Sequence, residues 1–233
     1  MPDKPTLLHR LVPDRIVLTF HGIGTPRRPL DPGEEPFWVN EQAFADAVAA
    51  AAENSKVEIT FDDGNASDAE IALPILKQAR MTATFFVLAG RLGEAGSLHP
   101  RDVATLVAEG MTVGSHGADH IDWTRATDET MRRELYDARA RIEDAAGVAV
   151  DALSIPFGAF DKRTLERAAA AGYSSVHTST GGVAAHDAWF VPRNTVRRDL
   201  QANTLIDRLD RWSARIDATL KAPLRAWKYG IRA

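Results

Sequence analysis

Two adjacent aspartates are the first residues in this chain whose types and spacing suggest chemistry. Asp62 and Asp63 follow the apolar, β-branched run 57–61 and precede Gly64. Two like charges side by side repel each other and lose hydration at the end of a buried strand, so a bound cation would stabilise them. The alternative is an Asp-Asp-Gly turn that caps the following helix.

Two histidines offer the matching ligands. His116 and His120 are four residues apart, which places both rings on one face of a helical turn and is also a common spacing in zinc sites. Two solvated histidines are the alternative. One carboxylate and two imidazoles would leave a fourth position open, the pattern of a catalytic zinc site. The chain has no cysteine, so any metal site must use His, Asp or Glu.

The elements that must position these residues alternate between strand and helix at least six times, which favours one parallel α/β domain. In such folds the chemistry collects where the strands end, and both motifs follow predicted strands. The predicted strands are 16–20, 57–61, 82–87, 111–113, 152–155, 174–177 and 189–191. The predicted helices are 41–53 after the cap Asn40, 67–80 with a break at Pro74, 100–110, 128–146, 162–171 and 203–220.

Composition sets the broad class. The chain has 233 residues, 45% of them hydrophobic, and a net charge of −4, which argues against a general nucleic-acid binder. Neither a signal-peptide stretch nor about 18 consecutive apolar residues is found, which predicts a cytoplasmic protein without a transmembrane segment. We expect a single domain over 1–233, with a motif-bearing core at 15–200 and a C-terminal helix and basic tail at 201–233. That tail either contacts an anionic surface or partner, or packs on its own domain.

The sequence resembles the polysaccharide deacetylases, the NodB-homology domain of carbohydrate esterase family 4. The resemblance rests on the segments 60–64, 115–120 and 156–158, which have the family's order and spacing and lie in a matching region of about 15–200. It implies a distorted (β/α)7-type barrel. It also implies a divalent ion held by Asp63, His116 and His120, usually Zn²⁺, with Co²⁺, Ni²⁺ or Mn²⁺ as alternatives. By the same match, Asp62 would be the general base.

The chain departs from the family pattern in two places. The family's general acid is commonly a histidine in a C-terminal Leu-x-His motif, whereas the last histidine here is His186. His21 resembles the arrangement of members that carry this element near the N-terminus, and His177 is the alternative. Many members also have an arginine before Pro-x-Gly, which pairs with the catalytic aspartate, and this chain has Ser154 there. Arg193 is the predicted replacement, with a surface arginine as the alternative.

The resemblance implies hydrolysis of the N-acetyl amide of N-acetylated sugars to acetate and a free amine. The backbone N–H of Phe157, in the turn that begins at Pro156, is the expected oxyanion donor. Trp38 and Trp123 would stack on sugar rings, or else belong to the core, and the loop 24–36 would border the cleft. The alternatives are a hydrolase of small non-sugar amides or imides on the same fold, and a non-catalytic sugar-binding or scaffold protein. The oligomeric state is not predicted.

Overall fold

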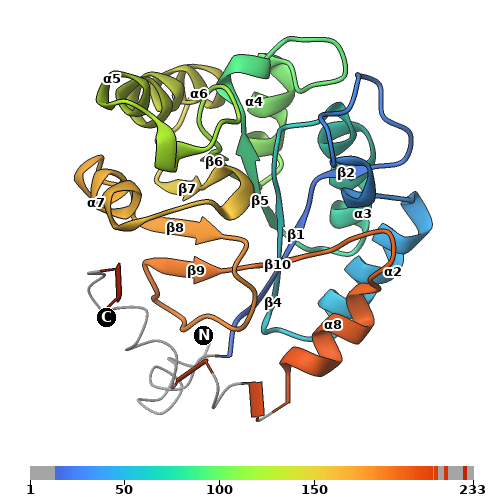
Figure 1. Ribbon diagram of the computed structural model, residues 1–233. Coiled ribbons are helices and arrows are strands. Elements are labelled where there is room, and N and C mark those ends of the chain that lie inside the picture. The colour runs from blue at the N-terminus through green and yellow to red at the C-terminus, as the bar shows by residue number, and fades with distance from the viewer. Residues whose placement is uncertain (1–13, 212, 215–217, 220–227, 230–233) are drawn as a thin grey trace.

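A curved sheet of parallel strands organises the fold (Figure 1). The computed structural model describes residues 14–211, 213–214, 218–219 and 228–229. In this part of the chain, the larger sheet has the strand order β10-β1-β4-β5-β6-β7-β8-β9. Its strands are β1 (Ile16–Phe20), β4 (Val57–Phe61), β5 (Ala83–Val87), β6 (Thr112–Ser115), β7 (Ala152–Ser154), β8 (Ser175–Thr178), β9 (Phe190–Pro192) and β10 (Asn194–Thr195).

The stretch 190–195 closes this sheet. β9 pairs with β8, and β10, which follows after Arg193, pairs with β1. One continuous piece of chain therefore bridges the two ends of the sheet, which curls into a nearly closed barrel. Counting 190–195 as one interrupted strand leaves seven strand positions, so the predicted distorted (β/α)7-type barrel is confirmed.

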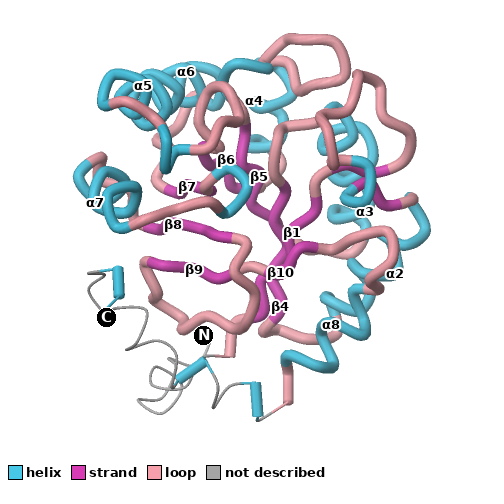
Figure 2. Tube along the Cα trace, viewed as in Figure 1, coloured by secondary structure: helices cyan, strands magenta, loops and turns pink. Residues whose placement is uncertain are grey.

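Helices surround the strands, as Figure 2 shows in cyan around magenta. The long helix expected at 128–146 is continuous from α5 (Asp128–Arg132) through the π-helical η5 (Arg133–Asp137) to α6 (Ala138–Ala146). A second π-helical segment, η2 (Asp68–Ala72), precedes α3 (Leu73–Gln78), which contains Pro74, where a break was predicted. The other α-helices are α2 (Glu41–Ala52), α4 (Pro100–Ala108), α7 (Lys162–Ala170) and α8 (Ala202–Leu209).

Side-chain alternation along β4 sets the direction of the first candidate residue. Phe61 packs outward in a stack with Phe85 of β5, with ring centroids 4.5 Å apart and planes within 5°. Such aromatic pairs are worth about 0.5–1.5 kcal/mol beyond the area that they bury. Because successive strand residues face opposite sides, Thr60 and Asp62 point into the barrel.

The last helix is shorter than predicted. α8 ends at Leu209, the last of its buried apolar residues, whereas the apolar spacing predicted a helix to residue 220. Asp210 follows directly and forms an ion pair with Lys56, with 2.8 Å between Oδ1 and Nζ. Within the predicted extension, the described residues 213–214 and 218–219 are helical, whereas residues 212, 215–217 and 220 lie outside the described residues.

The loop at 24–36 is held by internal contacts rather than extended into solvent. Arg28 and Glu34 form an ion pair with both side chains 8% exposed. The indole of Trp38 donates to Glu34 over 3.1 Å, and Trp38 belongs to β3 (Trp38–Val39), which pairs with β2 (Gly22–Ile23) in a small second sheet. Buried charge pairs of this kind fix one loop conformation.

Most of the basic tail at 221–233 lies outside the described residues. Of that tail, the structure describes Lys228 and Tyr229, and the Tyr229 ring packs edge-on against Phe160 at 5.0 Å. No described helix is long and apolar enough to cross a membrane.

Candidate metal centre and active site

Asp62 and Asp63 lie where β4 ends, and each is only 2% exposed. Asp62 continues the ladder, since its backbone N–H donates to the carbonyl of Phe20 over 2.9 Å. Asp63 then adopts a left-handed backbone conformation, with φ of 76°, and Gly64 follows with φ of 67°. A left-handed aspartate is strained, and such strain is concentrated at functional sites. The turn sends the two carboxylates into different surroundings.

His116 lies directly after β6 and is buried. Its Nδ1 is 2.9 Å from the carbonyl oxygen of Ser154, which can only accept a hydrogen bond, so Nδ1 carries the proton. The lone pair is then on Nε2, the atom that faces Asp63. Burial lowers the pKa of His116 to about 4, which keeps the ring neutral at neutral pH. A neutral imidazole is the form that binds a metal.

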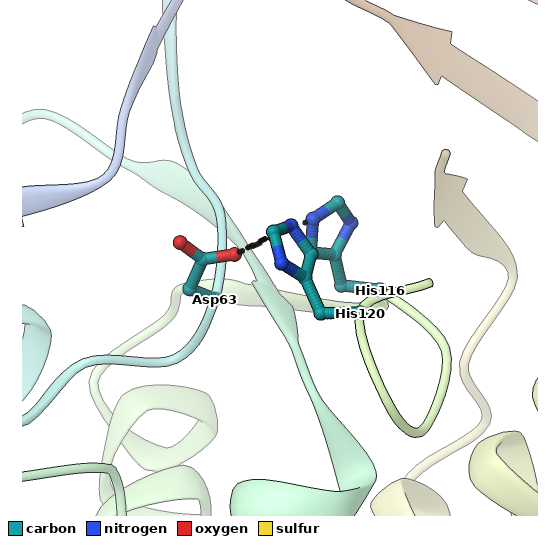
Figure 3. Close-up of side chains that lie close together, drawn as sticks. All are labelled: Asp63, His116 and His120. Atoms are coloured by element: carbon teal, nitrogen blue, oxygen red, sulfur yellow. Dashed lines mark ion pairs between the residues drawn. The ribbon is translucent and has the colours of Figure 1, made fainter. Parts of the chain in front are cut away.

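Asp63, His116 and His120 converge from two loops (Figure 3). Nε2 of each histidine is 3.5 Å from Oδ1 of Asp63, and the three prospective ligand atoms all lie within 4.8 Å of one another. Oδ1 of Asp63 is buried without a hydrogen-bond partner among the described residues. A buried carboxylate oxygen that faces the Nε2 atoms of two imidazoles fits a cation. Two nitrogens and one oxygen suit Zn²⁺, Co²⁺, Ni²⁺ or Mn²⁺.

Asp62 faces a different cation, the guanidinium of Arg193. Nη1 donates to Oδ1 over 2.7 Å and Nη2 to Oδ2 over 2.6 Å, so the pair is bidentate and buried. Arg193 also donates to Thr19 over 3.0 Å and to Thr60 over 3.2 Å. Burial is the largest single influence and acts to raise the pKa of Asp62. The charge and hydrogen bonds of Arg193, together with the nearby histidines His116 and His21, outweigh it and hold that pKa well below its ordinary range.

Arg193 therefore makes the contact that the sequence predicted for it. It stands between β9 and β10, and its side chain reaches residues of β1, β4 and β7. In β7, Nη2 also donates to Oγ of Ser154 over 2.6 Å. Ser154 in turn lies 3.3 Å from Oδ2 of Asp62. The small serine leaves room for a guanidinium that arrives from another strand.

The two histidines considered as general acid have different surroundings. His21 is half-buried, its ring lies 5.1 Å from that of Phe37, and its buried Nδ1 has no hydrogen-bond partner among the described residues. It is close enough to Asp62 to contribute to the lowering of that pKa. His177 is buried inside the barrel, where its Nε2 lies 3.2 Å from Oγ of Ser175. Burial holds the pKa of His177 well below its ordinary range, which disfavours a protonated form.

The turn at Pro156–Gly158 forms one side of the site. Pro156 is buried, whereas Phe157 is 63% exposed and has a left-handed backbone with φ of 58°. The Phe157 ring lies 4.2 Å from that of His120. An exposed aromatic ring beside the prospective ligands is suited to contact with an apolar face of a substrate.

The two tryptophans do not offer such a face. Trp38 is 3% exposed and Trp123 is 1% exposed, and both indole N–H groups donate to buried glutamates. The predicted stacking of sugar rings on these residues is therefore wrong for this structure. Apolar side chains are more stable when buried, and each indole finds its hydrogen bond inside.

Two acidic residues near the site were not singled out in the sequence. Asp31, in the loop 24–36, has Oδ2 at 3.8 Å from Nδ1 of His120 and forms an ion pair with Arg91. Thus the loop does border the site, as predicted. Asp68 is fully buried, and burial together with the charges of Asp63 and Asp62 raises its pKa well above the ordinary value. A carboxylate five residues after the Asp62-Asp63 pair was the available signal.

Comparison with known proteins gives the family. A family model described as polysaccharide deacetylase matches residues 49–176. A chitooligosaccharide deacetylase of Rhizobium leguminosarum bv. trifolii is 33% identical over 144 residues, which are 61% of this chain and 63% of that protein. The peptidoglycan-N-acetylglucosamine deacetylase PgdA of Listeria monocytogenes is 31% identical over 120 residues, 51% of this chain and 25% of that protein. The matches thus span less than two thirds of these relatives.

Solved structures share the fold at low identity. The deacetylase PplD of Streptococcus pyogenes, in complex with acetate, has a TM-score of 0.73 at 21% identity, with 84% of this chain and 98% of that chain covered. IcaB from Ammonifex degensii has a TM-score of 0.68 at 22% identity, with 83% and 96% covered. Because the family model matches more than half of the 233 residues, the chain belongs to the polysaccharide deacetylase family.

Proposed function

We propose that this protein is a divalent-metal-dependent deacetylase that hydrolyses the N-acetyl amide of N-acetylated sugars to acetate and a free amine. One observation carries the proposal. Asp63, His116 and His120 offer three ligand atoms within 4.8 Å of one another, directly beside the buried carboxylate of Asp62. The family membership and the substrates named for the relatives agree with this chemistry.

A divalent cation at Asp63, His116 and His120 would polarise the amide carbonyl and lower the pKa of a bound water from about 16 toward about 7. Asp62 is the proposed general base, which takes a proton from the attacking water. Its low pKa keeps it ionised at every working pH, and Arg193 fixes the direction of its two oxygens. Asp62 is therefore ready to accept a proton without first losing one.

Two further groups complete the proposed chemistry. The backbone N–H of Phe157 would donate to the oxygen that gains negative charge as the carbonyl is attacked. One such donor is worth about 3–4 kcal/mol of transition-state stabilisation. His21, as an imidazolium, would protonate the departing sugar nitrogen, since an amine anion is too basic to leave. The exposed ring of Phe157 would contact the sugar beside the bond that breaks.

The test is acetate release from chito-oligosaccharides and from peptidoglycan fragments, with the metal content of the protein measured in parallel. We expect release that stops when a chelator removes the metal and returns when Zn²⁺ is restored. Small N-acetyl amides and cyclic imides belong in the same panel. Cleavage of these alone would reject the sugar substrate, and metal binding without any cleavage would reject the enzymatic role.

A further inference from the structure

A fully buried glutamate lies behind the loop that carries the two histidines. Glu134 is 0% exposed and belongs to η5, the π-helical segment of the long helix. It occupies the inner face of that helix beside the buried apolar residues Met131, Leu135 and Ala138. A carboxylate in such a place is costly unless hydrogen bonds replace its lost hydration. The chemistry proposed above makes no use of Glu134.

The hydrogen bonds to Glu134 come from the histidine loop. Oε2 accepts from the backbone N–H of Ala118 over 2.7 Å, and Oε1 accepts from that of Asp119 over 3.3 Å. Oε2 also lies 3.3 Å from the indole nitrogen of Trp123, which donates to it. Ala118 and Asp119 lie between His116 and His120 in the sequence. The carboxylate therefore fixes the backbone between the two prospective ligands.

Gly117 shows how closely the carboxylate approaches this loop. A Cβ atom at Gly117 would lie 2.4 Å from Oε2 of Glu134 and 2.8 Å from the Trp123 ring, closer than any side chain allows. Gly117 has φ of 81°, and His120 also has a left-handed backbone with φ of 51°. A loop with a strained histidine persists only when its surroundings determine its shape.

We propose that Glu134 is a positioning residue for the cation site. Through the N–H groups of Ala118 and Asp119, it holds His116 and His120 at the separation at which both Nε2 atoms reach the same ion. The inference rests on the proposed function, because it assumes that these histidines bind a divalent cation. Residues that orient metal ligands from outside typically change metal affinity by about 10–100-fold when they are replaced.

The experiment is a measurement of Zn²⁺ affinity by competition with a chromophoric chelator. Glu134→Gln keeps the size of the side chain but replaces one acceptor oxygen by an N–H₂ group that faces other N–H donors. We expect its dissociation constant for Zn²⁺ to rise at least tenfold. The control is Glu129→Gln, which makes the same chemical change at an exposed position on α5. Its dissociation constant for Zn²⁺ should stay within twofold of that of the unaltered protein.

Thermal unfolding without metal separates positioning from a structural role. If Glu134 only stabilises the fold, Glu134→Gln lowers Tm but leaves the Zn²⁺ affinity within twofold, and that result overturns the inference. Should this variant not fold, Trp123→Phe removes a single hydrogen bond to the same carboxylate. A rise of at least twofold in the dissociation constant is expected there, and unchanged affinity would overturn the inference. If the unaltered protein itself binds no divalent cation, the proposed function fails instead.

Discussion

Asp62 and Asp63 are neighbours of the same type and equal burial, yet their surroundings are opposite. Asp62 is held by two hydrogen bonds from Arg193, a cation that the chain supplies from the segment between β9 and β10. Oδ1 of Asp63 has no hydrogen-bond partner among the described residues and faces two imidazole Nε2 atoms at 3.5 Å. The charge of Asp62 is balanced by a cation of the chain itself, whereas the proposed partner of Asp63 is a metal ion.

The difference teaches how one Asp-Asp pair can serve two roles. Two carboxylates in one site are assigned by the groups around them rather than by their own chemistry. In the proposed reaction, Asp62 would be ionised and directed for proton transfer, whereas Asp63 would offer an oxygen as a ligand. The turn at Asp63 and Gly64 makes this separation possible, because it directs the second side chain away from Arg193.

The largest expected effect is on metal binding by the proposed ligands. Asp63→Ala or His116→Ala should weaken Zn²⁺ binding by more than about 100-fold, beyond the range for residues that only orient ligands. Activity should fall with the metal. Metal analysis after dialysis, together with acetate release, measures both. Retention of one tightly bound ion per chain in either variant would remove that residue from the site.

Asp62→Asn should give the opposite combination. The variant should keep its metal but lose about 10²–10⁴-fold in kcat, the usual contribution of a general base. Asp63→Ala is its matched control, since the same experiment is done on the neighbouring carboxylate. Turnover near that of the unaltered protein would show that Asp62 is not the base.

The choice between His21 and His177 is decided by the leaving group. His21→Ala should lower kcat by about 10²-fold or more for an amide, which needs protonation to leave, and much less for an activated ester, which does not. His177→Ala should change both substrates alike, because His177 is buried and its pKa is held low. The reverse pattern would transfer the role to His177.

Arg193→Met would leave the carboxylate of Asp62 without its ion-pair partner. Without the guanidinium, the pKa of Asp62 rises, so the acidic limb of kcat/KM should move to higher pH. Breaking a buried ion pair typically costs about 3–5 kcal/mol of unfolding free energy. Arg193 stabilises the folded protein only while Asp62 is ionised, which lowers the folded-state pKa of Asp62. The loss of unfolding free energy should therefore be largest above the ordinary aspartate pKa and should shrink as the pH falls below it.

Ser154→Arg added to Arg193→Met tests whether the origin of the arginine matters. An arginine at position 154 stands where many members of the family carry one, close to the space that Arg193 vacates. The double variant should recover part of the lost stability and move the acidic limb back. If neither the stability to urea nor the pH profile recovers, the arginine must come from position 193 to support Asp62.

The smallest expected effect concerns Asp68, the third buried carboxyl. Its raised pKa means that the folded protein keeps a proton that the unfolded chain releases, so stability falls as pH rises above the ordinary aspartate value. Asp68→Asn removes this dependence. In metal-free protein, the unfolding free energy of the variant relative to that of the unaltered protein should rise by at most about 1.4 kcal/mol per pH unit between pH 4.5 and 7. A constant difference over that range would contradict the assignment.

The sequence predicted what local patterns determine. Period-two alternation predicts the strands, and the position of Asp62-Asp63 and of His116 to His120 after two of these strands places both motifs at one end of the sheet. Arg193 was proposed because a serine stood where a charge partner was needed. These predictions succeed because strand direction and the carboxyl-end rule are properties of the local chain and of the parallel fold.

Other features depend on tertiary contacts that no local pattern contains. For Trp38 and Trp123 the sequence allows either sugar stacking or a place in the core, and the structure shows the core: each indole is buried against a glutamate, Glu34 or Glu134. In the sequence, Glu134 interrupts the apolar face of the helix predicted at 128–146, and this charged residue among apolar ones was the only indication of its role. In the sequence, the apolar spacing continues beyond Leu209, whereas α8 ends at that residue. Spacing predicts which face is apolar but not where packing stops.

The most direct test of the central claim is a titration of metal-free protein with Zn²⁺, in which acetate release from an N-acetylated chito-oligosaccharide is followed. The account predicts that activity rises linearly and saturates at one ion per chain, with no rise in Asp63→Ala. Full activity in the metal-free protein with chelator present would contradict it.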